Sequence, residues 1–154
     1  HDYLEVYRSE GTVEAALRWG LNSERGSKGM GSTGVMSYGD LAANYAGLKF
    51  WLTLTDPELG HVACHHGKWV QTRCFDWGDH ITPAWDEGIN IPCYRPGSVS
   101  EKINKRICDL VARQRIPHRP PLDRHRLADL AEYYRPELLP WLVNPSSLRF
   151  VVMP

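Results

Sequence analysis

The chain has 154 residues, with 18 Lys and Arg residues against 18 Asp and Glu residues and therefore no net charge when histidine is neutral. This length suffices for a core of its own, and we expect a single compact domain over residues 1–154. A hydrophobic fraction of 42% excludes a disordered tail, and the charge balance excludes a strong polycation or polyanion. The most apolar stretch, residues 41–54, is shorter than the about 20 residues of a membrane span, so we expect no span.

The first half of the chain predicts two helices separated by a glycine-rich loop. Residues 12–20 form the first helix, because a threonine can cap its start and a glycine can end it. The loop covers residues 27–34. Ser37 and Asp40 then form a capping box, which opens the longest predicted helix. This helix ends before Pro57, because proline disfavours a helical residue before it.

The second half predicts a β-hairpin, a long loop and further helices. Strand-favouring residues flank a His66-Gly67 turn, and Ser98 and Glu101 form a second capping box. In chain order we expect a hairpin over 61–75, a loop over 76–97, helices over 98–113 and 124–134, a helical turn over 136–141 and a strand over 149–153. The predicted fold is α+β: an α-dominated single domain with three main helices, a small β-hairpin and a long irregular loop rich in Trp and Asp.

Four cysteines permit two disulfides in three connectivities. Cys64 and Cys74 flank the predicted hairpin, which makes them neighbours and leaves Cys93 and Cys108 as the second pair. Disulfides would indicate a secreted or cell-envelope protein. Four cysteines are also ordinary in a reduced cytosolic domain, so a cytoplasmic location stays open.

The loop after the hairpin gathers acidic and aromatic side chains, and it is the main candidate site. Its four acids are Asp76, Asp79, Asp86 and Glu87. A pair of carboxylates in unlike environments can divide into acid and base, as glycoside hydrolysis requires. We therefore predict a secreted or cell-envelope hydrolase that acts on a glycan or another small polar ligand, with His65 or His80 assisting. The predicted substrate-binding side chains are Trp77, Trp85, Asn90 and Asn44.

The same loop supports three other interpretations. Its aromatic and acidic side chains could form the recognition surface of a non-catalytic binding or interaction domain. Its carboxylate oxygens could hold Ca²⁺, although the spacing is not that of an EF-hand. Finally, the indoles could be core anchors and the acids could be turn formers without a functional role.

Histidines around the hairpin suggest a metal site. Imidazole binds transition metals and also serves as an acid or base near neutral pH. On a strand, His61 and His65 would lie on one face, and together with His80 they could form an open Zn²⁺ site. The spacing matches no strong zinc signature, so acid–base use of one histidine, or no role at all, stays open beside the divalent metal.

Residues 102–126 hold eight Lys or Arg residues against two acids. Such a patch could contact phosphates. However, no Phe, Tyr or Trp lies between Tyr94 and Tyr133, so the segment offers no stacking platform for single-stranded nucleic acid. We interpret it as a solvated helix face and linker, and we expect no nucleic-acid partner.

Near the amino terminus, Arg8 on a predicted strand is followed by a helix and by Ser32 and Thr33. This arrangement resembles ADP-ribosyltransferases of the arginine-first type. The resemblance covers less than a quarter of the chain, which lacks the later Glu-x-Glu pair of that family. It implies, as a minor alternative, an ADP-ribosyltransferase-like toxin domain.

Overall fold

The computed structural model describes residues 2–87, 89–113, 130 and 133–145. Its longer helices are α1 (Asp2–Glu10), α2 (Val13–Arg25), α3 (Tyr38–Thr53) and α4 (Val99–Ala112). Its strands are β1 (Val35–Met36), β2 (Val62–His65), β3 (Lys68–Gln71) and β4 (Cys93–Tyr94). Short helical turns are η1 (Trp77–Asp79), η2 (Pro83–Trp85), η3 (Pro136–Leu138) and α6 (Leu139–Leu142). The predicted α+β class with a dominance of helix is confirmed.

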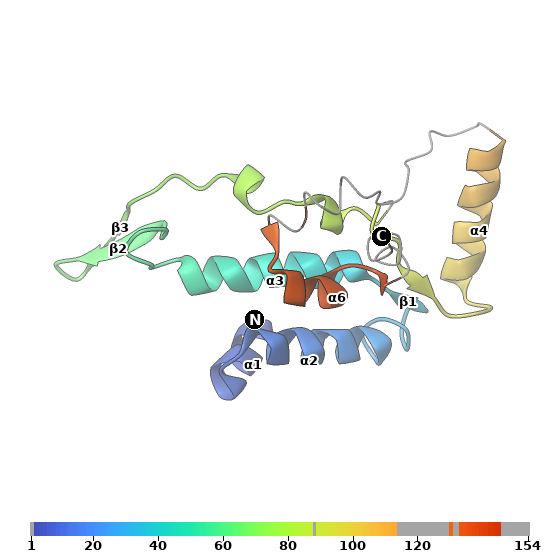
Figure 1. The fold of residues 1–154 in the computed structure, drawn as a ribbon, viewed down its shortest axis with the longest axis horizontal. Coiled ribbons are helices and arrows are strands. Elements are labelled where there is room, and N and C mark those ends of the chain that lie inside the picture. Colours follow the sequence, from blue (N-terminus) through green and yellow to red (C-terminus); the bar gives the residue numbers. More distant parts are fainter. Residues whose placement is uncertain (1, 88, 114–129, 131–132, 146–154) are drawn as a thin grey trace.

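The core lies where α1, α2 and α6 pack against α3 (Figure 1). Its fully buried larger side chains are Leu17, Leu41, Leu130, Leu138, Leu142 and Val143. The close approach of α1 to α2 depends on a glycine. A Cβ atom on Gly20 would overlap the hydroxyl of Tyr3, so this glycine makes the space in which the phenol ring lies.

The predicted helix starts are confirmed by their capping bonds. The Thr12 hydroxyl accepts from the Ala15 amide at 3.2 Å, and the Ser37 hydroxyl accepts from the Asp40 amide at 3.0 Å. The Ser98 hydroxyl likewise accepts a hydrogen bond where α4 begins. The predicted end at residue 20 is wrong, because α2 continues to Arg25. Gly20 lies inside the helix and serves packing rather than termination.

The predicted β-hairpin is confirmed. β2 and β3 are antiparallel, with Cys64 opposite Trp69, and His66 and Gly67 form the turn with φ angles of 50° and 76°. Positive φ at both turn residues is the geometry that matches the twist of a two-residue hairpin. Every residue of β3 is exposed, and the hairpin projects beyond the end of α3 (Figure 1).

Two features of the amino-terminal half differ from the expectations. Arg8 lies on helix α1 instead of a strand, so the arrangement that resembled ADP-ribosyltransferases is not formed. The hydroxyls of Ser32 and Thr33 donate to the carbonyls of Lys28 and Gly29, at 2.7 and 3.0 Å. They stabilise the turns of the glycine-rich loop. A second, two-residue pairing of β1 with β4, which is too short to leave a pattern in the sequence, holds this loop against residues 93–94.

The predicted disulfides are not formed. Cys64, Cys74, Cys93 and Cys108 all lie within the described residues, and each is a free thiol. No residue of α4 is buried, and its apolar residues Val99, Ile103 and Ile107 are exposed. Among the described helices, none combines the length and apolar character needed to cross a membrane. The predicted strand over 149–153 and most of the predicted helix over 124–134 lie outside the described residues.

Candidate functional site

The acids of the predicted loop site do not share one environment. The Asp76 carboxylate accepts from the Gly78 amide at 2.7 Å and caps η1. Asp79 forms an ion pair with Arg73 at 3.0 Å, and both side chains are about half exposed. Asp86 ends η2, where its carbonyl accepts the amides of two following residues. These groups stabilise the loop itself, whereas Glu87 lies near the start of α3.

The predicted substrate-binding residues of the loop divide between core and surface. Asn90 is fully buried, and its amide group donates to the carbonyls of Ala84 and Leu142 at 2.9 and 2.8 Å. Its side-chain oxygen accepts from the Asn144 amide at 2.9 Å. Trp85 is half-buried against the core. Trp77 alone is well exposed, at 63%. Asn90 is therefore an internal tie between the loop and the C-terminal part of the described chain.

The three histidines of the predicted metal site are not brought together. His61 and His80 approach each other, with ring centroids 6.2 Å apart. His65 is exposed on the hairpin. Across the described residues, no three His, Cys, Asp or Glu side chains are arranged to hold a metal ion. The predicted open Zn²⁺ site therefore lacks a complete ligand set in this part of the chain.

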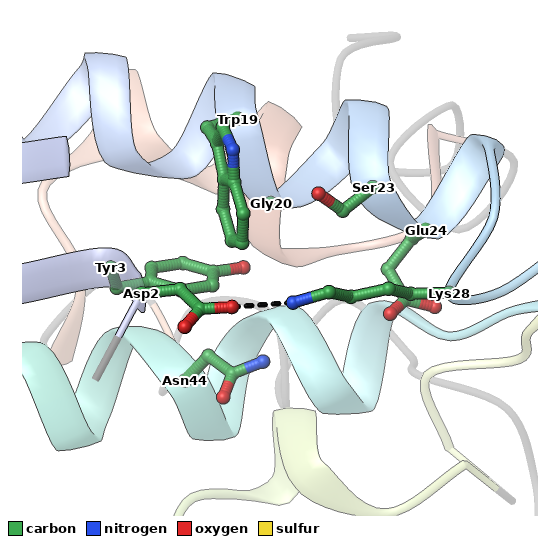
Figure 2. A pocket seen from close by; sticks show the side chains of 8 residues that line it. All are labelled: Asp2, Tyr3, Trp19, Gly20, Ser23, Glu24, Lys28 and Asn44. Atoms are coloured by element: carbon green, nitrogen blue, oxygen red, sulfur yellow. Dashed lines mark hydrogen bonds and ion pairs between the residues drawn. The ribbon is translucent and has the colours of Figure 1, made fainter. Parts of the chain in front are cut away.

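A polar cavity lies elsewhere, between the amino-terminal helices (Figure 2). It has a volume of about 220 Å³. Its lining comes from α1, α2, α3 and the glycine-rich loop, and comprises Asp2, Tyr3, Trp19, Gly20, Ser23, Glu24, Lys28 and Asn44. Of the residues predicted as substrate-binding, only Asn44 lines this cavity. The exposed amide of Asn44 projects toward it from α3 (Figure 2).

Lys28 spans the cavity from the glycine-rich loop. Its ammonium group forms an ion pair with the carboxylate of Asp2 on α1 (Figure 2). The same ammonium lies 4.7 Å from the ring centroid of Trp19, which is a cation–π distance. One side chain thus joins the loop to both amino-terminal helices.

The hydroxyl of Tyr3 is the least satisfied polar group of the cavity. Tyr3 is 8% exposed, and no group of the described chain is in hydrogen-bonding geometry with its hydroxyl, although the Asn44 side chain is near enough to lower the pKa of the phenol. Burial raises the pKa of this phenol above its usual value, so it stays protonated. A buried O–H group without a partner is costly, and a ligand in the cavity could accept its hydrogen bond.

Beside the cavity, Glu24 at the end of α2 is partly buried, and the charges of two exposed carboxyls, those of Asp40 and Glu87, act on it. Burial raises the pKa of Glu24, and the negative charges of Asp40 and Glu87 raise it further. The Ser37 amide, 3.5 Å from Glu24 Oε2, opposes this shift. The pKa of Asp40 is also raised, by burial and by Glu87. Carboxyl groups whose pKa values are raised in this way are typical of acid–base sites.

Sequence reasoning identified Asp40 as part of a capping box but did not identify Glu24. In the structure, the Ser37 amide donates to Glu24, so Glu24 takes the reciprocal capping bond expected of Asp40. Glu24 and Ser37 are 13 residues apart in the sequence. No local pattern in the sequence joins them. Tyr3 was equally undetectable, because its role depends on the packing of α1.

Comparison with models of protein families, with curated proteins and with solved structures found no match to this chain. The chemistry of the cavity and of the side chains around it is therefore the basis for a functional assignment.

Proposed function

We propose that the protein is a hydrolase that acts on a glycan, with Glu24 and Asp40 as its acid–base pair. The observation that carries this proposal is the unpartnered hydroxyl of Tyr3 in a polar cavity next to carboxyls of raised pKa. The secreted or cell-envelope location predicted from the sequence remains part of the proposal. The acid–base chemistry predicted from the sequence also remains part of the proposal, but the proposed catalytic carboxyls lie on α2 and α3 instead of the loop.

The proposed roles follow from position. Glu24 lines the cavity and has a raised pKa, so it can carry the proton that the leaving oxygen of a glycosidic bond receives. Asp40 does not line the cavity, but its charge acts on Glu24, and it is the candidate base that accepts a proton from the attacking water. Glu87, whose charge acts on both groups, keeps their proton affinity high.

The lining favours a small polyhydroxylated unit. Ser23, Asn44 and Tyr3 offer hydrogen-bonding groups beside the indole of Trp19, over which the Lys28 ammonium lies. Sites for drug-sized ligands have volumes of about 300–1,000 Å³. The observed 220 Å³ is smaller and suits one sugar unit of a longer substrate.

The test is hydrolysis of a panel of polysaccharides, namely chitin, xylan, starch and peptidoglycan, followed by the release of reducing ends. Glu24→Gln and Asp40→Asn should each lower kcat about 100-fold or more on the cleaved substrate. Asp76→Asn and Asp79→Asn are matched controls, because they neutralise carboxylates of the loop, and they should keep the activity of the unaltered chain. Failure to cleave any member of the panel, or full activity of Glu24→Gln, would refute the proposal.

The second candidate is the non-catalytic binding domain, which one observation favours. Trp77 is exposed and its ring centroid lies 4.9 Å from that of Phe75, so the two form an aromatic edge on the loop. In this case, calorimetric titration with soluble oligosaccharides should detect binding that Trp77→Ala removes and Glu24→Gln leaves unchanged. Loss of binding in Glu24→Gln would instead place the ligand in the cavity.

A further inference from the structure

Four aromatic rings form a closed cluster at the end of α3, far from the cavity in the fold. Phe50 comes from α3, His61 from the segment before β2, and Phe75 and His80 flank η1. Each ring contacts the other three, with all six centroid separations between 5.1 and 6.2 Å. Each imidazole therefore contacts both phenyl rings.

Main-chain hydrogen bonds hold both histidines in place. The His61 amide donates to the Leu54 carbonyl at 2.9 Å, and the His61 carbonyl accepts from Thr72 at the same distance. The His80 amide donates to Trp77 at 3.0 Å. Main-chain hydrogen bonds to different segments therefore hold the backbone at both histidines.

Each imidazole has one nitrogen that is buried and has no hydrogen-bond partner among the described residues. These atoms are Nδ1 of His61 and Nε2 of His80, and His61 is only 7% exposed. A buried nitrogen without a partner is destabilising, and two of them in one cluster need a common explanation. A neutral imidazole nitrogen is also a ready metal ligand.

The distance between the rings matches two imidazoles that share one ion. With a metal–nitrogen bond of about 2.0 Å and about 1.1 Å from the nitrogen to its ring centroid, linear coordination through nitrogens that lie on the line between the centroids places the centroids about 6.2 Å apart. The observed separation is 6.2 Å. A tetrahedral angle at the metal would bring the rings closer together. We propose that His61 and His80 bind one Cu(I) ion in linear, two-coordinate geometry.

The surroundings favour a soft, singly charged ion. From the centroid separations of Phe50, His61 and His80, an ion midway between the two imidazoles would lie about 4.7 Å from the Phe50 ring centroid. From the corresponding separations of Phe75, the same ion would lie about 4.4 Å from the Phe75 ring centroid. Both distances are within the cation–π range of about 6 Å. Structural Zn²⁺ prefers four ligands, and the described residues supply two here.

The experiment measures Cu(I) binding to the full chain by competition with the chromophoric chelator bicinchoninate, under ascorbate. Cysteine also binds Cu(I), so the thiols are first alkylated and the fold is checked by near-ultraviolet circular dichroism. We expect one Cu(I) per chain. His61→Phe and His80→Phe should each weaken binding at least tenfold, whereas the matched control His65→Ala, on the exposed hairpin, should bind as the unaltered chain does.

Absence of binding to the alkylated chain, or equal loss in His65→Ala, would overturn the assignment. If a phenylalanine variant fails to fold, X-ray absorption of the copper-loaded, alkylated chain decides the question. Two nitrogen neighbours at about 2 Å would support the proposal. Three or four neighbours, or a sulfur neighbour, would refute it. Zn²⁺ should bind at least tenfold more weakly than Cu(I), and equal affinity would also contradict linear coordination.

Discussion

The helical end of the molecule and its hairpin–loop end contain similar polar residues but use them differently. In the loop over residues 76–90, Asp76 caps a turn, Asp79 pairs with an arginine, and Asn90 is saturated by three hydrogen bonds. At the helical end, Tyr3 has no partner for its hydroxyl in the described chain, and Glu24 has a raised pKa. A high density of acids in a loop can therefore reflect local turn formation, because short carboxylate side chains readily satisfy backbone amides.

The physical basis of the difference is burial. Exposed loop carboxylates are solvated or bonded to nearby amides, and these interactions favour the charged form. Packed helices can instead withdraw a carboxyl from water and set it beside other carboxyls from distant parts of the chain. Glu24 illustrates this, because it is partly buried and the charges of Asp40 and Glu87, two exposed carboxyls from other segments, raise its pKa further.

The largest effect that would sharpen this comparison is expected for Asn90→Ala. The substitution removes three buried hydrogen bonds, which the Asn90 side chain makes with the Ala84 and Leu142 carbonyls and with the Asn144 amide. We expect the free energy of unfolding to fall by about 3 kcal/mol, as measured by urea denaturation. Asn44→Ala, at the exposed asparagine of the cavity, should change it by less than about 0.5 kcal/mol. Equal losses in the two variants would contradict the assignment of Asn90 to the core.

Gly20→Ala tests the packing that forms the cavity. Its new methyl group would overlap the Tyr3 hydroxyl, so we expect a loss of about 1–3 kcal/mol in the free energy of unfolding. Gly47→Ala, in the exposed middle of α3, is the matched control, because no atom lies within 4 Å of the new methyl group. The free energy of unfolding of this control should rise by up to about 1 kcal/mol, because alanine has a higher helix propensity than glycine. Urea denaturation of both variants gives the comparison, and equal changes would argue against the tight contact of α1 with α2.

Glu24→Gln should raise the free energy of unfolding at neutral pH, whereas Asn90→Ala and Gly20→Ala should lower it. The raised pKa of Glu24 means that the folded chain binds this proton more tightly than the unfolded chain. The stability contributed by the carboxyl is therefore lost as the pH rises from about 4.3, the unfolded value, through the raised folded value. The variant should be more stable than the unaltered chain at pH 7, and the difference should vanish below about pH 4.

Glu101→Gln is the control for that pH dependence. Hydrogen bonds from the Gly97 amide and Lys105 lower the pKa of Glu101, so its stabilising effect is present at neutral pH and is lost as the pH falls. This variant should be less stable than the unaltered chain at pH 7 and equal to it in acid. Thermal melts between pH 3 and pH 7, approximately the range of carboxyl titration, measure both variants. If both variants changed stability in the same direction at pH 7, the opposite pKa shifts of Glu24 and Glu101 would be refuted.

The smallest effect is expected for the ion pair of the loop. Arg73 and Asp79 are both about half exposed, so their attraction is screened by water and salt. A double-mutant cycle with Arg73→Ala and Asp79→Ala should yield a coupling energy below about 1 kcal/mol. A coupling of several kcal/mol would show that the loop is more rigid and more enclosed than its exposure indicates.

The local elements were predictable because their signals lie within a few residues of each other. Ser37 and Ser98 begin α3 and α4 as capping residues, and His66-Gly67 forms the hairpin turn. Helix α1 was missed, since Asp2–Glu10 has no such start signal within the chain. The disulfide pairing was wrong because cysteine spacing alone does not define the distance between thiols.

The sequence by itself determined where most secondary structure begins, and it predicted Asn44 as a substrate-binding residue and His61 and His80 as metal ligands. Tertiary structure alone decided which of them share a site. Tyr3 and Asn44 line one cavity only because α1 packs across α2 and α3. His61 and His80 meet only because the backbone between them folds back through the hairpin. Burial, raised pKa and ligand geometry depend on distances between segments, and no short-range pattern contains that information.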